Sequence, residues 1–289
     1  MIITIASGKG GVGKSTLAAS LAVLLARDFN FQLIDADVDC PDLHILFPGR
    51  EELRKPVSLT KLAEIDFNKC DKCMICYEKC PFNAISKSLK IDEFLCEGCG
   101  YCKHVCPQNA ISMKQVRTGE IVKKRVELVF DGKRIKFPFI YGQLDPGRSN
   151  SGKLVDELKR FKEDTQLTLV DSAAGIGCPV ISSLRGSDLV LAVVEPTPAA
   201  IDDLSRLLDL SQHFGIETLA VLNKSDISGK GRQMAIDLLT ERGVELIGEI
   251  PYHRSAFDAL AMGKPLVMTD SPLKEKIISI YDELKRVIE

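Results

Sequence analysis

The sequence lacks any apolar run long enough to cross a bilayer, since the longest runs, such as 21–26, span only a few residues. It also lacks a strong excess of charge, with a formal net charge of −2 and an isoelectric point near 6.2. This balance gives no electrostatic footprint for nucleic acid. A conventional signal peptide is not expected, because a glycine-rich motif already begins at residue 8. We therefore expect a cytoplasmic protein with no membrane anchor and no nucleic-acid partner.

The remaining composition is that of an ordinary globular protein, with 45% hydrophobic and 27% charged residues. A chain of 289 residues can bury a full core and can form one large or two smaller domains. Its ten cysteines stand out. In the cytoplasm so many thiols favour metal or redox chemistry over a disulfide framework.

The N-terminal segment joins a strand-like apolar run, 1–6, to a glycine-rich loop and then to an amphipathic helical pattern. The loop fits the phosphate-binding pattern G-x-x-x-x-G-K-[ST]. Glycines let backbone N–H groups approach phosphates, and a helix start adds partial positive charge. Lys14 can reach the β- and γ-phosphates, and the Ser15 hydroxyl can bind Mg²⁺. The nucleotide-binding residues predicted in this loop are Gly8, Lys9, Gly10, Gly11, Val12, Gly13, Lys14, Ser15 and Thr16.

The cysteines are concentrated in two runs with the spacing C-x2-C-x2-C-x3-C-P. The segments 70–86 and 96–112 share nine of 17 aligned residues, which indicates an internal duplication. Two such runs are typical of a bacterial-type ferredoxin with two [4Fe–4S] clusters, in which the fourth cysteine of each run binds the other cluster. Zinc is the alternative, because C-x2-C pairs also suit tetrahedral zinc. The predicted ligand sets are Cys70, Cys73, Cys76 and Cys106 for one cluster, and Cys96, Cys99, Cys102 and Cys80 for the other.

Carboxylates follow two further apolar runs of the chain. The run 31–34 leads to Asp35 and Asp37, and the run 167–170 leads to Asp171. In an open α/β sheet, the carboxyl ends of the strands face the ligand crevice. We therefore expect these carboxylates to lie near the phosphate-binding loop.

A second lysine inside the loop makes the motif more specific. The order Lys-Gly-Gly-Val-Gly-Lys-Ser-Thr, beginning at Lys9, resembles the deviant Walker A motif of the MinD/Mrp/nitrogenase-iron-protein superfamily of P-loop ATPases. In that family the extra lysine reaches across a nucleotide-sandwich dimer to the partner's phosphates. The resemblance implies a homodimer across the nucleotide. It also implies three catalytic residues: Lys9, Lys14 and Asp37, the last of which positions the attacking water.

The same resemblance suggests roles for residues further along the chain. Ser15, Asp35 and Asp171 would form the magnesium site, and the Gly175 amide in switch II would sense the γ-phosphate. Asn223 opens an Asn-Lys-x-Asp sequence similar to that of GTPases, but the deviant loop favours ATP. The resemblance thus places Asn223 and Pro251 at the adenine base.

Two cysteines lie outside the ferredoxin-like runs. Cys178 follows Asp171 at the offset of an intersubunit cluster ligand in the nitrogenase iron protein, but the loop 145–153 supplies no second cysteine. An extra redox or ligand role for Cys178 and a plain interface role both remain open. Cys40 is expected to be a small buried residue.

The alternation of strands and helices predicts an α/β fold, a doubly wound and mainly parallel sheet of the P-loop NTPase type. Residues 1–59 and 117–289 would form this ATPase domain, and a small α+β ferredoxin-like domain would be inserted at 60–116. The segment 53–60 is interpreted as a linker. Apolar alternation around Asp131-Gly132 predicts a hairpin. The final helix carries mixed charges and is expected to pack onto the domain.

These features predict an ATP-binding and ATP-hydrolysing iron–sulfur protein. Its cofactors would be ATP, Mg²⁺ and two [4Fe–4S] clusters, with nucleotide-driven dimer switching coupled to electron transfer toward an unidentified redox partner. Hydrolysis would be slow without that partner. The alternative is an iron–sulfur carrier or scaffold of the Mrp type that delivers clusters to apo-proteins, with Cys40 and Cys178 as a labile site. A MinD-like spatial regulator is less favoured, because a basic, aromatic membrane-targeting helix is missing.

Overall fold

The computed structural model describes residues 1–289, which separate into two compact units. The large unit contains residues 1–54, 121–143 and 151–289, and the small unit contains residues 55–120 and 144–150. None of the helices combines the length and hydrophobicity that a membrane-spanning segment requires.

The large unit is organised around one extended sheet, and the sheet's strands have the following bounds. They are β1 (Ile2–Ser7), β2 (Phe31–Ala36), β3 (Gly49–Val57), β6 (Gly119–Phe130), β7 (Lys133–Leu144), β8 (Leu167–Ala174), β9 (Leu189–Val194), β10 (Glu217–Asn223) and β11 (Glu245–Ile250). The nine strands lie in the order β11-β10-β9-β1-β8-β2-β7-β6-β3. Every neighbouring pair from β11 to β7 is parallel. The predicted α/β fold with a large, mainly parallel sheet is confirmed.

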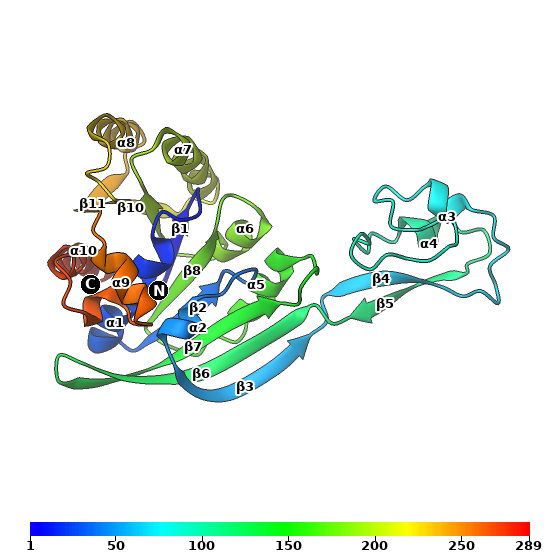
Figure 1. The fold of residues 1–289 in the computed structure, drawn as a ribbon, viewed down its shortest axis with the longest axis horizontal. Helices are drawn as coiled ribbons and strands as arrows, with labels where there is room; N and C mark the ends of the chain where they lie inside the picture. The colour runs from blue at the N-terminus through cyan, green and yellow to red at the C-terminus, as the bar shows by residue number, and fades with distance from the viewer. The chain divides into compact units, whose positions relative to one another are not determined.

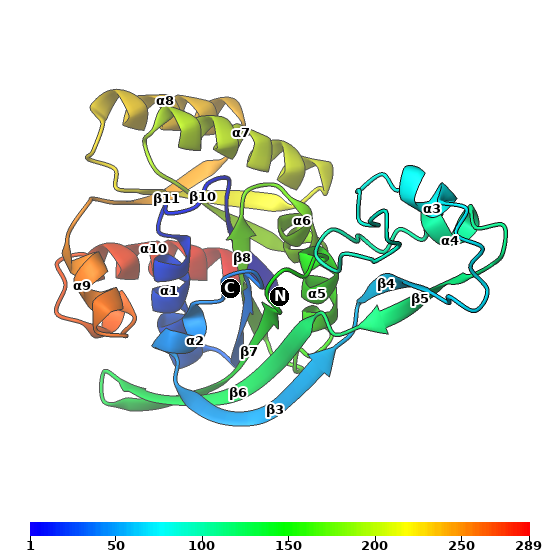
Figure 2. The same ribbon diagram turned by 45° about the vertical axis from the view of Figure 1, so that its right-hand side comes forward.

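Helices cover both faces of this sheet, as parallel strands joined by crossovers require. Their bounds are α1 (Lys14–Asp28), α2 (Leu43–Leu46), α5 (Ser151–Lys159), α6 (Cys178–Leu184), α7 (Pro198–His213), α8 (Gly229–Glu241), α9 (Ser255–Ala261), the 3₁₀ helix η1 (Leu266–Met268) and α10 (Lys274–Ile288). Helices α1 and α10 pack together on one face, and α5, α6, α7 and α8 lie on the other (Figure 1). Figure 2 shows α7 and α8 side by side. Because the central strands of the sheet are buried on both faces, their sequences are largely apolar runs. In β9, for example, all six residues are buried.

The C-terminal helix α10 packs onto the domain, as its sequence predicts. Its buried residues are Ile277, Ile280, Tyr281 and Leu284. Tyr281 also donates a hydrogen bond of 2.5 Å from Oη to Oδ2 of Asp28, the last residue of α1. Helix α1, which starts at the phosphate loop, is therefore bound at its C-terminal end to helix α10.

The hairpin prediction is confirmed. The segment 53–60, interpreted as a linker, does contain the boundary between the two units, but residues 53–57 are part of a strand. Strands β6 and β7 are joined by Asp131 and Gly132, whose φ angles of 48° and 75° suit a tight two-residue turn. Residues 49–57 form β3, the edge strand beside β6. The charges that suggested a linker belong to an exposed edge, where charged side chains discourage pairing with other chains.

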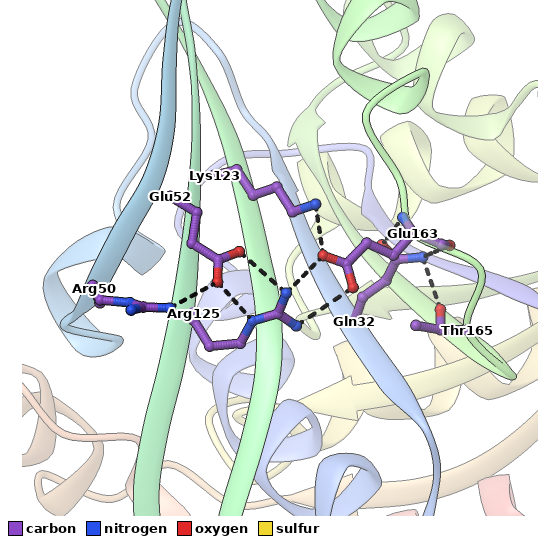
Figure 3. Close-up of polar contacts among 7 residues, drawn as sticks. All are labelled: Gln32, Arg50, Glu52, Lys123, Arg125, Glu163 and Thr165. Carbon is purple, nitrogen blue, oxygen red and sulfur yellow. Dashed lines mark hydrogen bonds and ion pairs between the residues drawn. The ribbon is translucent and has the colours of Figure 1, made fainter.

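An ionic network holds this edge of the sheet (Figure 3). Arg125 on β6 donates from Nε to Glu52 on β3 at 3.1 Å and from Nη2 to Glu163 at 2.9 Å. Lys123 also pairs with Glu163, at 2.6 Å. Gln32, buried on β2, donates to Thr165 at 2.8 Å and accepts from the Glu163 amide at 2.8 Å. The network thus joins the charged edge to the buried centre of the sheet.

The small unit contains a two-stranded antiparallel sheet and two short helices. The elements are β4 (Thr60–Ile65), β5 (Ile111–Val116), α3 (Ile75–Glu78) and α4 (Tyr101–His104). Its small core comprises Ala63, Cys76, Ile85, Leu89 and Ile111, with five further cysteines packed against it. Phe82, Phe94 and Tyr101 of this unit are exposed and do not join its core. A unit with so few buried side chains has little core of its own.

The sequence duplication in the small unit is also a duplication of backbone conformation. Three pairs of residues 26 positions apart share positive φ angles: Lys72 and Gly98 (61° and 64°), Met74 and Gly100 (64° and 76°), and Asn83 and Asn109 (53° and 50°). Left-handed backbone is uncommon for residues other than glycine. Its recurrence at lysine, methionine and asparagine shows that each half wraps its cysteines with the same chain path.

Candidate nucleotide site and cysteine clusters

The phosphate loop connects β1 to α1, as the sequence predicts. Gly13 precedes the first residue of α1 and has a φ of 94°, a conformation that favours glycine. A Cβ atom there would lie 2.2 Å from Nδ2 of Asn223, so space as well as backbone conformation requires glycine. Asn223 in turn donates to the carbonyl oxygen of Val12 at 2.6 Å. This contact occupies a loop carbonyl and leaves the loop N–H groups available to an anion.

Lys14 lies buried beside Asp171, with 2.7 Å between its Nζ and Oδ1 of the aspartate. The side chains are 7% and 0% exposed. Burial by itself lowers the pKa of Lys14, but Asp171, Asp35 and Asp37 outweigh it, and the net effect raises the pKa above its ordinary value. The lysine is therefore charged and is held by carboxylates at the end of the sheet.

The carboxylates meet there because of strand register. Asp35 on β2 and Asp171 on β8 are direct partners across two parallel strands. Burial, together with Asp171 and Asp42, raises the pKa of Asp35 well above its ordinary value. Oδ2 of Asp171 is buried and has no hydrogen-bond partner. A buried carboxylate oxygen without a donor fits the oxygen ligands of a magnesium ion. The Ser15 hydroxyl, 3.4 Å from Lys14 Nζ, approaches the same lysine as Asp171 does.

Asp37 lies at the same end of β2 and is partly buried. Burial raises its pKa, and the nearby charge of Lys14 opposes that rise. Its carboxylate accepts from the Cys40 amide at 3.3 Å. Cys40 itself is exposed, so the expectation that it is buried is wrong. Cys40 lies in a bend that follows the end of strand β2, and no helix or strand covers it there.

Two lysines approach one carboxylate on the other side of the loop. Nζ of Lys9 lies 3.4 Å from Oε1 of Glu195, and Nζ of Lys224 lies 2.7 Å from its Oε2. Lys224 also donates to the carbonyl oxygen of Gly11 at 2.8 Å. Neither Glu195 nor Lys224 is among the residues that the sequence predicts for this site. The signal available for Glu195 was its position directly after β9, the same position that drew attention to Asp35 and Asp171.

A mostly apolar cavity of about 270 Å³ opens beside the loop. Asn223 and Pro251, the predicted base contacts, both line it. So do Gly13 and Thr16 from the loop and Tyr252 from the segment after β11. A flat aromatic ring suits such a cavity, because apolar walls with a few polar groups are typical of ligand sites.

The switch II segment follows β8. The Gly175 amide donates to the carbonyl oxygen of Ser7 at 2.9 Å, so contact with a phosphate would require this segment to move. Cys178 is exposed at the first position of α6 and lies against Gly152 of α5. No second cysteine follows it in the large unit.

The small unit brings the eight clustered cysteines together as two quartets. One small cavity is lined by Cys70, Cys73, Cys76 and Cys106, and a second by Cys80, Cys96, Cys99 and Cys102. These are the two sets that the spacing predicts as ligand groups. Nowhere do three or more His, Cys, Asp or Glu side chains approach closely enough to share one metal ion.

Backbone N–H groups point at sulfur atoms of both quartets. The Ala84 amide donates to Sγ of Cys80 and the Ala110 amide donates to Sγ of Cys106, each at 3.4 Å and 26 positions apart. The Lys72 amide donates to Sγ of Cys70 at 3.4 Å. Such donors stabilise thiolates and influence the reduction potential of iron–sulfur clusters. Each quartet therefore offers four thiols and at least one backbone donor to sulfur, the kind of donor set that a four-cysteine cluster uses.

The parallel sheet with a phosphate loop at the carboxyl end of β1 defines a P-loop nucleotide-binding protein. The model of the CobQ/CobB/MinD/ParA nucleotide binding domain matches residues 3–266, and the chain belongs to this family. It is 33% identical over 290 residues to an uncharacterized protein of Methanocaldococcus jannaschii, covering 100% of this chain and 98% of that protein.

Two more distant similarities are informative. The iron-sulfur cluster carrier protein of Aquifex aeolicus is 24% identical over 303 residues, covering 100% of this chain and 68% of that protein. The structure of the septum site-determining protein MinD of Pyrococcus horikoshii, complexed with Mg-ADP, matches with a TM-score of 0.61 and 17% identity, covering 99% of this chain and 96% of that one. The structural match establishes the fold.

Proposed function

We propose that this chain hydrolyses ATP as a nucleotide-bridged homodimer and couples that cycle to electron transfer through two [4Fe–4S] clusters. The observation that carries the proposal is the pairing, in one chain, of a deviant phosphate loop with two separate cysteine quartets. The family relationship supports nucleotide binding, and the lysine-rich loop favours ATP. The small unit acts as the inserted ferredoxin-like domain.

The phosphates bind at the N-terminus of α1, where the loop amides and Lys14 face them. Lys14 is now paired with Asp171, and an incoming triphosphate competes for the lysine. Ser15 and Asp171 would hold Mg²⁺, with Asp35 in support, and the ion would supply charge neutralisation on the phosphates. The unpartnered Oδ2 of Asp171 supports this assignment.

Hydrolysis needs a positioned water and additional positive charge. Asp37 is the residue at the end of β2 that orients the water, and Lys9 reaches the phosphates of the partner subunit. Asn223 and Pro251 enclose the adenine in the apolar cavity. Because phosphoryl transfer depends on positioning and charge, a lysine delivered in trans makes turnover depend on dimerisation.

The cysteine quartets would hold the two clusters, which supply one-electron transfer when bound. The protein contributes eight thiolates, three backbone donors to sulfur, and a small apolar core around Ile85 and Ile111. Closed four-cysteine sites hold clusters firmly, which suits electron transfer better than delivery. The partner that donates or accepts the electrons is a second redox protein.

The deciding experiment is anaerobic purification followed by metal analysis and electron paramagnetic resonance of the reduced protein. Two clusters predict about eight irons and eight sulfides per chain and the spectra of reduced [4Fe–4S] centres. Reduction potential and electron-transfer rate are then measured with and without ATP. Zinc in place of iron would contradict the redox proposal, and identical values in both nucleotide states would contradict the coupling.

A second candidate is an iron–sulfur carrier that delivers clusters to apo-proteins. The similarity to the carrier protein of Aquifex aeolicus favours it, and so does the exposure of Cys40 and Cys178. Iron transfer to an apo-acceptor that is lost in Cys178→Ala but survives loss of the quartets would support the carrier. A MinD-like spatial regulator is the third candidate, and the family match supports it.

A further inference from the structure

Glu195 occupies the turn between β9 and α7, where its carboxylate lies between the side chains of two lysines. One oxygen faces Lys9, the lysine proposed to act in the partner subunit, and the other faces Lys224. The Glu195 side chain is 10% exposed, whereas that of Lys9 is 41% exposed. Burial alone would raise the pKa of Glu195, but Lys224 and Lys9 outweigh it and hold the pKa below its ordinary value.

The two ion pairs differ in strength. Lys224 is anchored twice, at 2.7 Å to Glu195 and at 2.8 Å to the carbonyl oxygen of Gly11. Lys9 has the longer contact of 3.4 Å and a more exposed side chain. Glu195 is also fixed from its own turn, because Thr197 donates to its Oε1 at 3.3 Å. Glu195 is thus a fixed anchor, and Lys9 is the member of the group that can leave.

We infer that Glu195 is a positioning residue that holds Lys9 within its own subunit and thereby opposes dimerisation until nucleotide phosphates outcompete it. The inference rests on the proposed function, in which Lys9 acts across the dimer. An ion pair whose lysine is partly exposed, as Lys9 is, contributes little binding energy. A bound triphosphate carries several negative charges, so it draws the same lysine away. Glu195 therefore sets how much protein or nucleotide is needed for the dimer to form.

The test is sedimentation velocity across a protein concentration series with a saturating non-hydrolysable ATP analogue. Glu195→Gln keeps the size of the side chain and removes its charge. We expect the dimerisation midpoint to fall by about two- to fivefold, the range of one partly exposed ion pair. Glu249→Gln is the matched control, because Glu249 pairs with Arg232 at 2.6 Å away from the phosphate loop and its loss should leave the midpoint unchanged.

A second comparison shows which of the two lysines is responsible for the effect of Glu195→Gln. In a Lys224→Gln background, Glu195→Gln should still lower the midpoint, because the Lys9 contact remains to be released. Disappearance of the effect there would show that it acts through Lys224 and would overturn the inference.

The proposed function and the inference fail in different ways. A wild-type protein that never dimerises with the analogue overturns both. A wild-type dimer with the same midpoint in Glu195→Gln overturns the inference alone.

Discussion

Lys14 and Asp171 form a buried ion pair of 2.7 Å although they are 157 positions apart in the chain. The pair exists because β1 and β8 are neighbours, which brings the start of α1 to the end of β8. One member is proposed to bind phosphate and the other magnesium. The two proposed ligand-binding charges thus neutralise one another in this arrangement.

Removal of one partner of this pair should be costly. Asp171→Ala leaves Lys14 buried without its nearest carboxylate, and such a loss typically destabilises a protein by about 3–5 kcal/mol. We expect a lower urea midpoint together with loss of magnesium-dependent nucleotide binding. Asp209→Ala removes the partner of Arg242 in an exposed pair and serves as the control. Equal stability of the Asp171 and Asp209 variants would contradict the buried-pair interpretation.

Lys9→Ala should separate binding from hydrolysis. The side chain does not line the base cavity and is held by Glu195, so ATP binding should remain measurable. Turnover should fall by roughly 10³-fold or more, as when a charge supplied in trans is removed. Phosphate release and equilibrium binding of a fluorescent ATP analogue measure the two effects. Unchanged turnover would remove the argument for a lysine acting across the dimer.

The crossed cysteine quartets can be tested by pairs of substitutions. Cys73→Ser combined with Cys106→Ser affects a single quartet, although the residues belong to different sequence runs. Iron content should fall to about half. Cys73→Ser combined with Cys80→Ser affects both quartets, although both residues belong to one sequence run, and should lower iron content further. The opposite ranking would mean that each run binds its own cluster.

Asp28 should make stability depend on pH in the acidic range. The Arg27 guanidinium, with Tyr281 and Lys285, holds the pKa of Asp28 well below its ordinary value. The unfolded chain therefore binds a proton more readily than the folded chain, and the stabilisation is complete above about pH 4 and lost as the pH falls further. Asp28→Asn should cost about 1–3 kcal/mol at pH 7 and weaken this acidic dependence.

Urea unfolding at pH 7 and pH 3 measures the effect. Tyr281→Phe removes one hydrogen bond to the same carboxylate and should give a smaller change in the same direction. An acidic dependence as steep in Asp28→Asn as in the wild type would show that another group controls it.

Much of the fold and of the candidate site could be predicted from short sequence patterns. The order of glycines and lysines before Ser15 indicates the loop because backbone N–H groups and a helix start act within a few residues. The spacing of the cysteines likewise indicates the duplicated unit, and the positive φ angles at Met74 and Gly100 follow the same repeat. The edge strand β3 was missed because charges and Pro56 are as compatible with an exposed strand as with a linker.

The sequence by itself determined the phosphate loop, the duplicated cysteine runs and the alternation of strands and helices, because each depends on chemistry within a short stretch of chain. The tertiary structure decided which distant side chains meet. Strand order placed Asp35 opposite Asp171, and the turn after β9 brought Glu195 to Lys9, 186 positions away. Such contacts depend on which strands are neighbours, a property of the whole sheet that no single segment encodes.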